Sequence, residues 1–405
     1  MRSYLKCFRF SLLGDKEKDM KMIHDKTRSA FHLNVKNSLI MFIIIVFLSG
    51  CNTAGEEKPV SRLDDGHLYY MEYEKDYYGP EVMQKMRELG IIDPGCSTFF
   101  TYNTDGEPLA CRNYDYPHRV SKEDKSFTGL NVVLHCKPEG KYESISVADA
   151  IWCDPENPQL IANGPDQKDF DFSLLDVLPY QCGDGINEKG LFVCMMKLDI
   201  KEGDQPGRIP AGSSILLRYM LDDCANVEEA IRKVETSLIT PEDWQGCHFF
   251  VSDAQGNYAV IESRNSEVSI VDCNVVTNFY LAYDDAEDYY KKDELREEAV
   301  LITDENGEII YSFGYGHGYH RFITIAAQLE RFRDLNSEDL RTTMPEEQAL
   351  VILQSAVQNS FTEAVGTSFT QYSAIYNSAK KTVRVWSFQD YGKSYSFDVT
   401  GKRID

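Results

Sequence analysis

The feature that most constrains the fold is a predicted β-hairpin that begins at a cysteine nearly a hundred residues into the chain. Ser97–Asn103 is rich in β-forming residues, Thr104–Glu107 has the composition of a turn, and Pro108–Arg112 is expected to be the return strand. Antiparallel strands bring the start of one beside the end of the other. The hairpin therefore places Cys96 close to Arg112 and, just beyond it, Asp115.

The rest of the chain alternates between similar hairpins and helical segments. A turn at Asp184–Gly190 leads into the apolar run Leu191–Met196, and further hairpins are expected at residues 248–262 and 371–388. Helices are expected at Pro80–Leu89, Ser213–Leu221, Val227–Val234, Phe322–Arg333 and Pro345–Gln358. This alternation predicts an α+β domain in which antiparallel sheets are covered by helical layers.

The composition limits the partners of the chain. It has 405 residues, of which 42% are hydrophobic, enough for one large core or two smaller ones, and its formal net charge is −23. A surface this acidic repels phosphate backbones, so nucleic acid is not expected as a partner. The cysteines show no zinc-like spacing, and we expect no metal and no other cofactor.

An apolar run near the N-terminus indicates export. Leu39–Leu48 is too short to span a bilayer comfortably but suits the hydrophobic part of a secretory signal. Leu48-Ser49-Gly50-Cys51 follows at once and resembles the bacterial lipobox, whose cysteine is lipidated and becomes the new N-terminus. We therefore expect residues 1–50 to be a signal peptide and Cys51 to carry a lipid; the alternative is a short membrane anchor that is never cleaved. Either way the bulk of the chain lies outside the cytoplasm, at the cell envelope or, after release, in the periplasm or medium, where some cysteines could pair.

Residues 51–95 are expected to be a tether and a pro-segment. Residues 52–75 are polar and rich in Glu, Lys and Asp, which is typical of a linker, and the helix at 80–89 is assigned to the pro-segment. We expect self-cleavage between Gly95 and Cys96, where the small Gly95 allows a strained backbone. The domain proper is then residues 96–405.

Such a cleavage would give Cys96 both a nucleophile and a base. A free α-amine has a pKa of roughly 7.7–8.0 and a thiol one of roughly 8.5, so one residue can attack a carbonyl and return a proton to the leaving amine. The guanidinium of Arg112 would favour the thiolate, and the carboxylate of Asp115 could hold the amine. Taken alone, Cys96 could instead be a disulfide or core residue, and Arg112 with Asp115 a surface ion pair.

These motifs resemble the choloylglycine hydrolase and penicillin V acylase family, linear amide hydrolases among the N-terminal nucleophile hydrolases. Cys-Ser-Thr-Phe-Phe at residues 96–100 and Arg-Asn-Tyr-Asp-Tyr at 112–116 are similar to the start of that family, which places an arginine sixteen and an aspartate nineteen residues after its cysteine. Asn187–Leu191 is similar to the family's turn before a central strand. The resemblance covers most of residues 96–388 and implies a four-layer αββα sandwich.

The resemblance also implies roles for three further residues. Val276-Thr277-Asn278 is similar to the family's Thr-Asn element, which makes Asn278 the side-chain donor to the oxyanion of the tetrahedral intermediate. Arg321, within Gly316–Phe322, is the second arginine of the site. A backbone amide near Lys197 would be the other oxyanion donor; the family usually has an asparagine there, so Lys197 is a departure.

The implied function is hydrolysis of the C–N bond of a linear, non-peptide N-acyl amide through a thioester on Cys96. Conjugated bile salts, penicillin V and N-acyl amino acids or lipids all remain open as substrates, and such a small molecule is the expected partner. A homo-oligomer is also left open. Two alternatives remain: a surface lipoprotein that binds acylated small molecules without catalysis, and an acyltransferase of the same fold.

Overall fold

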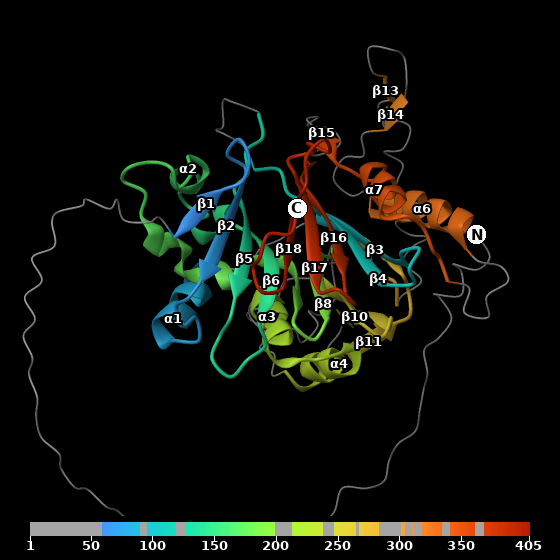
Figure 1. Cartoon of the computed structure of the whole chain (residues 1–405), viewed down its shortest axis with the longest axis horizontal. Coiled ribbons are helices and arrows are strands. Elements are labelled where there is room, and N and C mark those ends of the chain that lie inside the picture. Colours follow the sequence, from blue (N-terminus) through green and yellow to red (C-terminus); the bar gives the residue numbers. More distant parts are fainter. Residues whose placement is uncertain are drawn as a thin grey trace, which may run out of the picture. The chain divides into compact units, whose positions relative to one another are not determined.

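Two large β-sheets form the centre of the computed structural model (Figure 1). The structure describes residues 59–89, 95–118, 126–198, 213–237, 247–264, 267–282, 301–303, 309–311, 318–333, 341–360 and 368–405. The expected signal peptide and Cys51 lie outside these ranges. Within them, no helix combines the length and the apolar character needed to cross a membrane.

The first sheet has nine strands in the order β1-β2-β5-β6-β7-β8-β9-β10-β11. Their bounds are β1 (Val60–Arg62), β2 (Leu68–Tyr73), β5 (Asn131–Cys136), β6 (Ser144–Asp149), β7 (Cys182–Asn187), β8 (Phe192–Lys197), β9 (Cys247–Ser252), β10 (Tyr258–Arg264) and β11 (Glu267–Val271). Neighbouring strands are antiparallel except β2 and β5, which are parallel. The sequence had led us to expect antiparallel sheets throughout, so this pair is a correction.

The second sheet has seven strands and contains the hairpin that begins at Cys96. Its order is β12-β3-β4-β16-β17-β18, with β15 paired to β16. The bounds are β3 (Gly95–Tyr102), β4 (Pro108–Asp115), β12 (Val275–Val276), β15 (Asn359–Ser360), β16 (Ser368–Asn377), β17 (Thr382–Ser387) and β18 (Tyr395–Asp398). The β3–β4 turn closes because the Asn103 side chain accepts the N–H groups of Asp105 and Glu107, and Gly106 supplies the positive φ of 78°.

Helices cover the outer face of each sheet (Figure 1). Helices α3 and α4 lie against β7–β10 of the first sheet, and α6 and α7 lie against β3, β4 and β12 of the second. The helices and 3₁₀ turns are α1 (Pro80–Leu89), α2 (Pro158–Ala162), α3 (Ser213–Asp223), α4 (Val227–Thr236), α6 (Gly318–Leu329), α7 (Glu346–Gln354), η2 (Ala150–Cys153), η3 (Phe172–Tyr180) and η6 (Glu330–Phe332), and a small separate sheet pairs β13 (Leu301–Thr303) with β14 (Ile309–Tyr311). This confirms the four-layer αββα arrangement.

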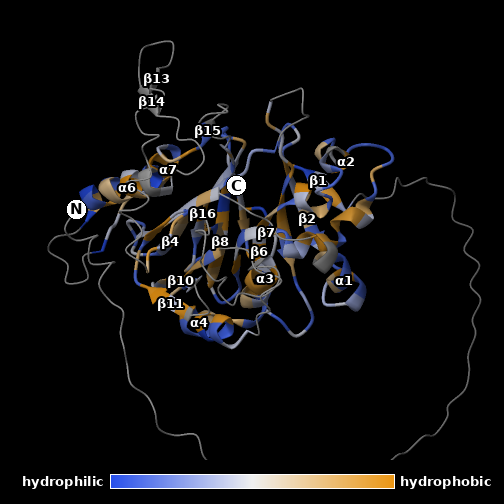
Figure 2. Ribbon diagram, turned by 180° about the vertical axis from the view of Figure 1, so that it is seen from behind, coloured by the Kyte–Doolittle hydropathy of each residue, from blue (hydrophilic) through white to orange (hydrophobic). Residues whose placement is uncertain are grey.

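The alternation of side chains along the strands builds two cores. On β8, Phe192, Cys194 and Met196 face the second sheet, whereas Val193 and Met195 face α3 and the outer core. Phe192 packs against Tyr376 of the second sheet with ring centroids 4.7 Å apart. In Figure 2, hydrophobic residues accordingly run along strands such as β8 and β10. The hairpin formed by β3 and β4 is thus one wall of the core between the sheets.

Part of the segment expected to be a tether, residues 60–73, instead belongs to the first sheet. Residues 60–62 and 68–73 form β1 and β2, and β2 pairs over its whole length with β5. Leu68, Tyr69 and Met71 are buried, whereas the charged residues of the segment stay mostly exposed, because the strands lie at the edge of the sheet. The polar composition of residues 52–75 therefore concealed an edge strand.

A buried ion pair anchors the same N-terminal segment to α3. The hydroxyls of Tyr77 and Tyr78 donate to Oδ2 of Asp222 at 2.9 and 2.6 Å. The guanidinium of Arg218 holds the other oxygen of that carboxylate at 2.6 Å, and both charged side chains are fully buried. Residues 59–89 are therefore integrated with the domain that follows Cys96.

We predict that Asp222→Ala destabilises the protein by about 3–5 kcal/mol, because it leaves the Arg218 guanidinium buried without its carboxylate. Asp223→Ala is the matched control: this neighbouring carboxylate is partly exposed and pairs with Lys141 and Lys233 at 2.6 Å, so its loss should cost under about 1 kcal/mol. Equilibrium urea unfolding of both variants measures the difference. Equal losses would show that the buried pair does not anchor the segment.

Candidate active site

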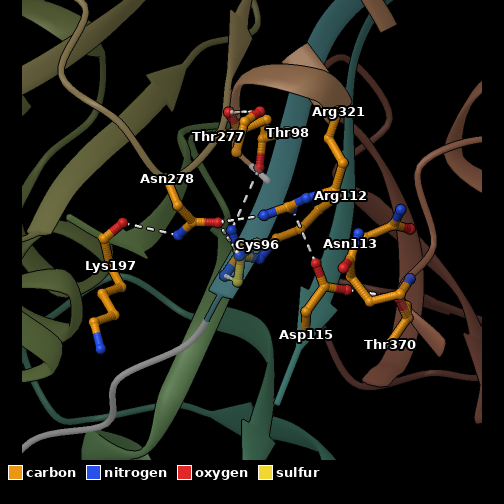
Figure 3. A network of polar contacts seen from close by, with 12 residues as sticks. Cys96, Thr98, Arg112, Asn113, Asp115, Lys197, Thr277, Asn278, Arg321 and Thr370 are labelled. Carbon is orange, nitrogen blue, oxygen red and sulfur yellow. Dashed lines mark hydrogen bonds and ion pairs between the residues drawn. The ribbon is translucent and has the colours of Figure 1, made fainter. Parts of the chain in front are cut away.

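The hairpin register places Cys96 at the start of β3 beside the end of β4. Cys96 lies opposite Tyr114, and Thr98 lies opposite Arg112. The three polar side chains Cys96, Thr98 and Arg112 therefore share the face that points toward the first sheet. Figure 3 shows them gathered around the cysteine. The structure thus brings together the cysteine and the arginine predicted to activate it.

The guanidinium of Arg112 holds the sulfur of Cys96. Its Nη2 donates to Cys96 Sγ at 3.0 Å and to the carbonyl of Met195 at 2.8 Å, and its Nη1 donates to Thr98 Oγ1 at 3.3 Å. Arg112 is fully buried, which costs free energy unless the charge is compensated. Its Nε lies 2.5 Å from Oδ2 of Asp184, which supplies that compensation.

Asp184 is a site residue that the sequence reasoning missed. It was assigned to a turn, but it lies inside β7 and is fully buried. Besides Arg112, its carboxylate accepts hydrogen bonds from the hydroxyls of Tyr372, at 2.6 Å, and Tyr376. The signal available in the sequence was an acidic residue between two glycines in an otherwise apolar run. This signal does not identify the basic partner, Arg112, which lies seventy-two positions earlier.

Asn278 contacts the nitrogen of Cys96. Its Oδ1 accepts the Cys96 N–H at 2.9 Å and Nη2 of Arg321 at 2.6 Å, while its Nδ2 donates to the carbonyl of Lys197 at 2.8 Å (Figure 3). Asn278 follows the short edge strand β12, which pairs with Thr98 and Phe99 of β3. The predicted Asn278, Lys197 and Arg321 therefore meet at the first residue of the expected mature chain.

Asp115 and Arg321 form a second buried pair on the helical side of the hairpin. Nη1 of Arg321 donates to Oδ2 of Asp115 at 3.0 Å, and the hydroxyl of Thr370 donates to Oδ1 at 2.6 Å. Burial raises the pKa of Asp115 to about 6, against the opposing influence of Arg321, and burial likewise lowers the pKa of Arg321. Burial thus disfavours both charges, and the surrounding packing must hold the pair together.

The surroundings of Cys96 oppose ionisation of its thiol. The residue is completely buried, and burial raises the pKa of its thiol to about 12, although the guanidinium of Arg112 acts in the opposite direction. Burial of the sulfur therefore outweighs the influence of the guanidinium on this thiol. The residues predicted to surround Cys96 already contact it in the chain that still carries Gly95.

Gly95 differs from the expectation in one respect. It is the first residue of β3, paired opposite Asp115, and its φ is not in the left-handed region. A Cβ added there would meet the Asp115 carbonyl oxygen at 3.7 Å, which is an ordinary contact. The backbone before the nucleophile therefore shows no strain that requires glycine.

The other cysteines and the possible metal ligands can be assessed in the part of the chain that the structure describes. There, all nine cysteines, Cys96 included, are buried free thiols, so none forms a disulfide. They pack as small apolar residues. Over the same ranges, no group of three or more His, Cys, Asp or Glu side chains is arranged to hold a metal ion.

The four-layer fold is the one that the resemblance to the choloylglycine hydrolase and penicillin V acylase family implies. A family model described as acyl-coenzyme A:6-aminopenicillanic acid acyl-transferase matches residues 164–313. That range includes Asp184, Lys197 and Asn278 but neither Cys96 nor Arg321. No curated protein sequence matches the chain significantly.

Among solved structures, a mutant of the conjugated bile acid hydrolase from Clostridium perfringens aligns with a TM-score of 0.45 and 16% identity, over 76% of this chain and 96% of that one. The penicillin V acylase from Agrobacterium tumefaciens aligns with a TM-score of 0.42 and 15% identity, over 75% of this chain and 91% of that one.

We predict that the raised pKa of Asp115 makes stability depend on pH between about 4 and 6. The folded state binds this proton more tightly than the unfolded state does, so the stabilisation is present below pH 4 and is lost as the pH rises through 6. A shift from the ordinary value of about 3.9 to about 6 corresponds to about 3 kcal/mol.

The comparison is between Cys96→Ala, which prevents cleavage, and Cys96→Ala with Asp115→Asn. Their difference in the free energy of unfolding should change by about 3 kcal/mol between pH 4 and pH 7, with the protein that retains Asp115 losing stability as the pH rises. Urea unfolding at several pH values measures it. A difference that is independent of pH would show that Asp115 titrates normally.

Proposed function

We propose that the protein is a cysteine N-terminal nucleophile hydrolase that cleaves the C–N bond of a linear N-acyl amide. The observation that supports this most directly is the pair of contacts on Cys96. Arg112 donates to its sulfur at 3.0 Å, and Asn278 accepts from its nitrogen at 2.9 Å. One residue that acts as nucleophile and base needs a partner for each of these atoms.

Activation would be an intramolecular acyl shift followed by hydrolysis. The sulfur of Cys96 attacks the carbonyl carbon of Gly95, the C–N bond to Cys96 breaks, and the nitrogen takes up a proton to become the free α-amine. Water then hydrolyses the Gly95 thioester, which releases a carboxylate and regenerates the thiol. Residues up to Gly95 become a separate N-terminal fragment, and Cys96 becomes the N-terminus of the remaining chain.

Turnover would repeat the same chemistry on an external amide. The α-amine takes the thiol proton, the sulfur attacks the acyl carbon, and that proton passes to the leaving amine. The oxyanion would be held by Asn278 and by a backbone N–H near Lys197, where the carbonyl of Lys197 already fixes the Asn278 side chain at 2.8 Å. No step requires a cofactor. Conjugated bile salts, penicillin V and N-acyl amino acids or lipids are the substrate classes to test.

Acyl transfer to an amine is the second candidate function, and the matched acyl-transferase family model favours it. Both reactions share the Cys96 thioester and differ only in whether water or an amine resolves it.

We also propose that the chain is exported and anchored by a lipid on Cys51. The support is the apolar run Leu39–Leu48 followed directly by the lipobox-like Leu48-Ser49-Gly50-Cys51. Because Cys51 precedes the cleavage site, an anchored N-terminal segment would keep the catalytic domain at the membrane only while the two parts stay associated.

We predict that protein expressed from residue 52 cleaves itself at Gly95–Cys96 and that Cys96→Ala does not. Cys111→Ala, which removes a buried thiol on β4, is the control and should still be cleaved. Intact mass measures this, and native size-exclusion chromatography should recover both fragments together because β2 remains paired with β5. Only the cleaved proteins should hydrolyse an amide substrate.

Uncleaved wild-type protein would mean that a separate protease is needed or that the protein only binds acylated molecules. These two explanations can be distinguished by inserting a recognition site for an added protease directly before Cys96 and cutting the chain there, so that Cys96 gains a free α-amine. Amide hydrolysis after that treatment supports the enzyme, and its absence supports the binding protein.

We predict further that the thioester partitions mainly to water. With a good amide substrate and a competing amine, such as hydroxylamine or glycine, the free carboxylic acid should remain the major product in mass-spectrometric product analysis. A transferred acyl product that exceeds the acid at millimolar amine would make acyl transfer the function.

A further inference from the structure

A buried histidine–glutamate pair lies beside the site and has no role in the chemistry described above. His248 on β9 and Glu262 on β10 are directly opposite each other in the sheet register, and both are fully buried. His248 is two positions from Phe250, and Glu262 is two positions from Val260, so each shares the face of its neighbour. Phe250 and Val260 belong to the core between the sheets, and the pair therefore points toward the second sheet. Nδ1 of His248 lies 3.0 Å from Oε1 of Glu262.

The pair holds both ends of the segment that contains Asn278. Nε2 of His248 contacts the carbonyl oxygen of Thr277 at 2.6 Å. The two carboxylate oxygens of Glu262 accept the backbone N–H groups of Leu281 and Ala282, each at 2.8 Å. Three backbone groups of residues 277–282 are thus fixed by two side chains of the first sheet.

The partner of Nε2 shows which ring nitrogen of His248 carries a proton. A carbonyl oxygen only accepts, so Nε2 of His248 carries a proton and donates it to Thr277. Nδ1 of His248 faces Oε1 of Glu262 at 3.0 Å, an ordinary hydrogen-bond distance, so the imidazole ring is held between Glu262 and the Thr277 carbonyl.

Burying such a pair is weak support for stability, because desolvation offsets most of the attraction. Its geometric effect is specific, however. His248 fixes Thr277 directly before Asn278, and in the sheet it lies opposite Met196, the residue before Lys197. Nδ2 of Asn278 is in turn bonded to the Lys197 carbonyl. The pair therefore links the two proposed oxyanion donors to one rigid part of the first sheet.

We infer that His248 and Glu262 are positioning residues that set the orientation of Asn278 and so control the rate of the chemical step. This inference rests on the proposed amide hydrolase function. If Asn278 stabilises the oxyanion only when it is held in place, loosening residues 277–282 lowers kcat and leaves substrate binding largely unchanged.

The variants separate the contacts of the pair. His248→Leu removes both, His248→Gln keeps a donor that can reach the Thr277 carbonyl, and Glu262→Gln removes the charge. Phe249→Leu is the control, because Phe249 is buried on the same strand but faces the outer core. Each is measured with the cleaved protein for kcat, KM and melting temperature, alone and combined with Asn278→Ala.

We expect His248→Leu and Glu262→Gln to lower kcat by about 10- to 100-fold, with KM changed by less than about threefold. His248→Gln should recover part of the loss. In the Asn278→Ala background, His248→Leu should cause little further loss, because it acts through Asn278. Equal losses in both backgrounds, or an equal loss in Phe249→Leu at the same melting temperature, would overturn the inference.

Hydrogen exchange distinguishes a failure of this inference from a failure of the proposed function. If wild-type protein cleaves no amide, the proposed function fails, but mass-spectrometric exchange of residues 277–282 still reports positioning. Exchange should be faster in His248→Leu than in Phe249→Leu. Equal exchange in the two variants would show that the pair does not hold the segment.

Discussion

The charge of Arg112, buried between two sheets, is the constraint on which the rest of the site depends. A guanidinium without water must find partners for its charge and its N–H groups, and here they come from both sheets: Asp184, the Met195 carbonyl, Thr98 and Cys96. Compensating the arginine therefore fixes the spacing of β3, β7 and β8 around the nucleophile. The sulfur is one of the partners of a charge that the core cannot leave unpaired.

The hairpin separates two electrostatic environments, because residues three apart on a strand face opposite sides. Arg112 points toward the first sheet, whereas Asp115 points toward the helical layer, where it meets Arg321 and Thr370. The sulfur of Cys96 is associated with the first environment and its nitrogen, through Asn278 and Arg321, with the second. The proposed nucleophile and the proposed base would thus be tuned by different charges, although they belong to one residue.

The sequence predicts the hairpins, most helices and the five residues that converge on Cys96, because turn chemistry and motif spacing are local signals. It does not predict what depends on distant partners. Asp184 looks like part of a glycine-rich turn until Arg112 is placed beside it, and a buried His248 cannot be recognised before Thr277 is seen to lie against it. The strands within residues 60–73 are not predicted, because the segment around them is charged. The apolar residues of Leu68–Tyr73 are too few to change its average composition.

The position of the proposed cleavage explains how a buried cysteine could become accessible without unfolding. The chain before the cut is held in the first sheet by β2 and by the contacts of Tyr77 and Tyr78, and the chain after it is held in the second sheet by β3. Gly95 occupies the place opposite Asp115. Its departure after cleavage would leave a space next to Cys96, at the position that Gly95 had occupied. A substrate carbonyl entering that space meets the groups that had acted on the Gly95 carbonyl, so maturation and turnover would use one set of donors.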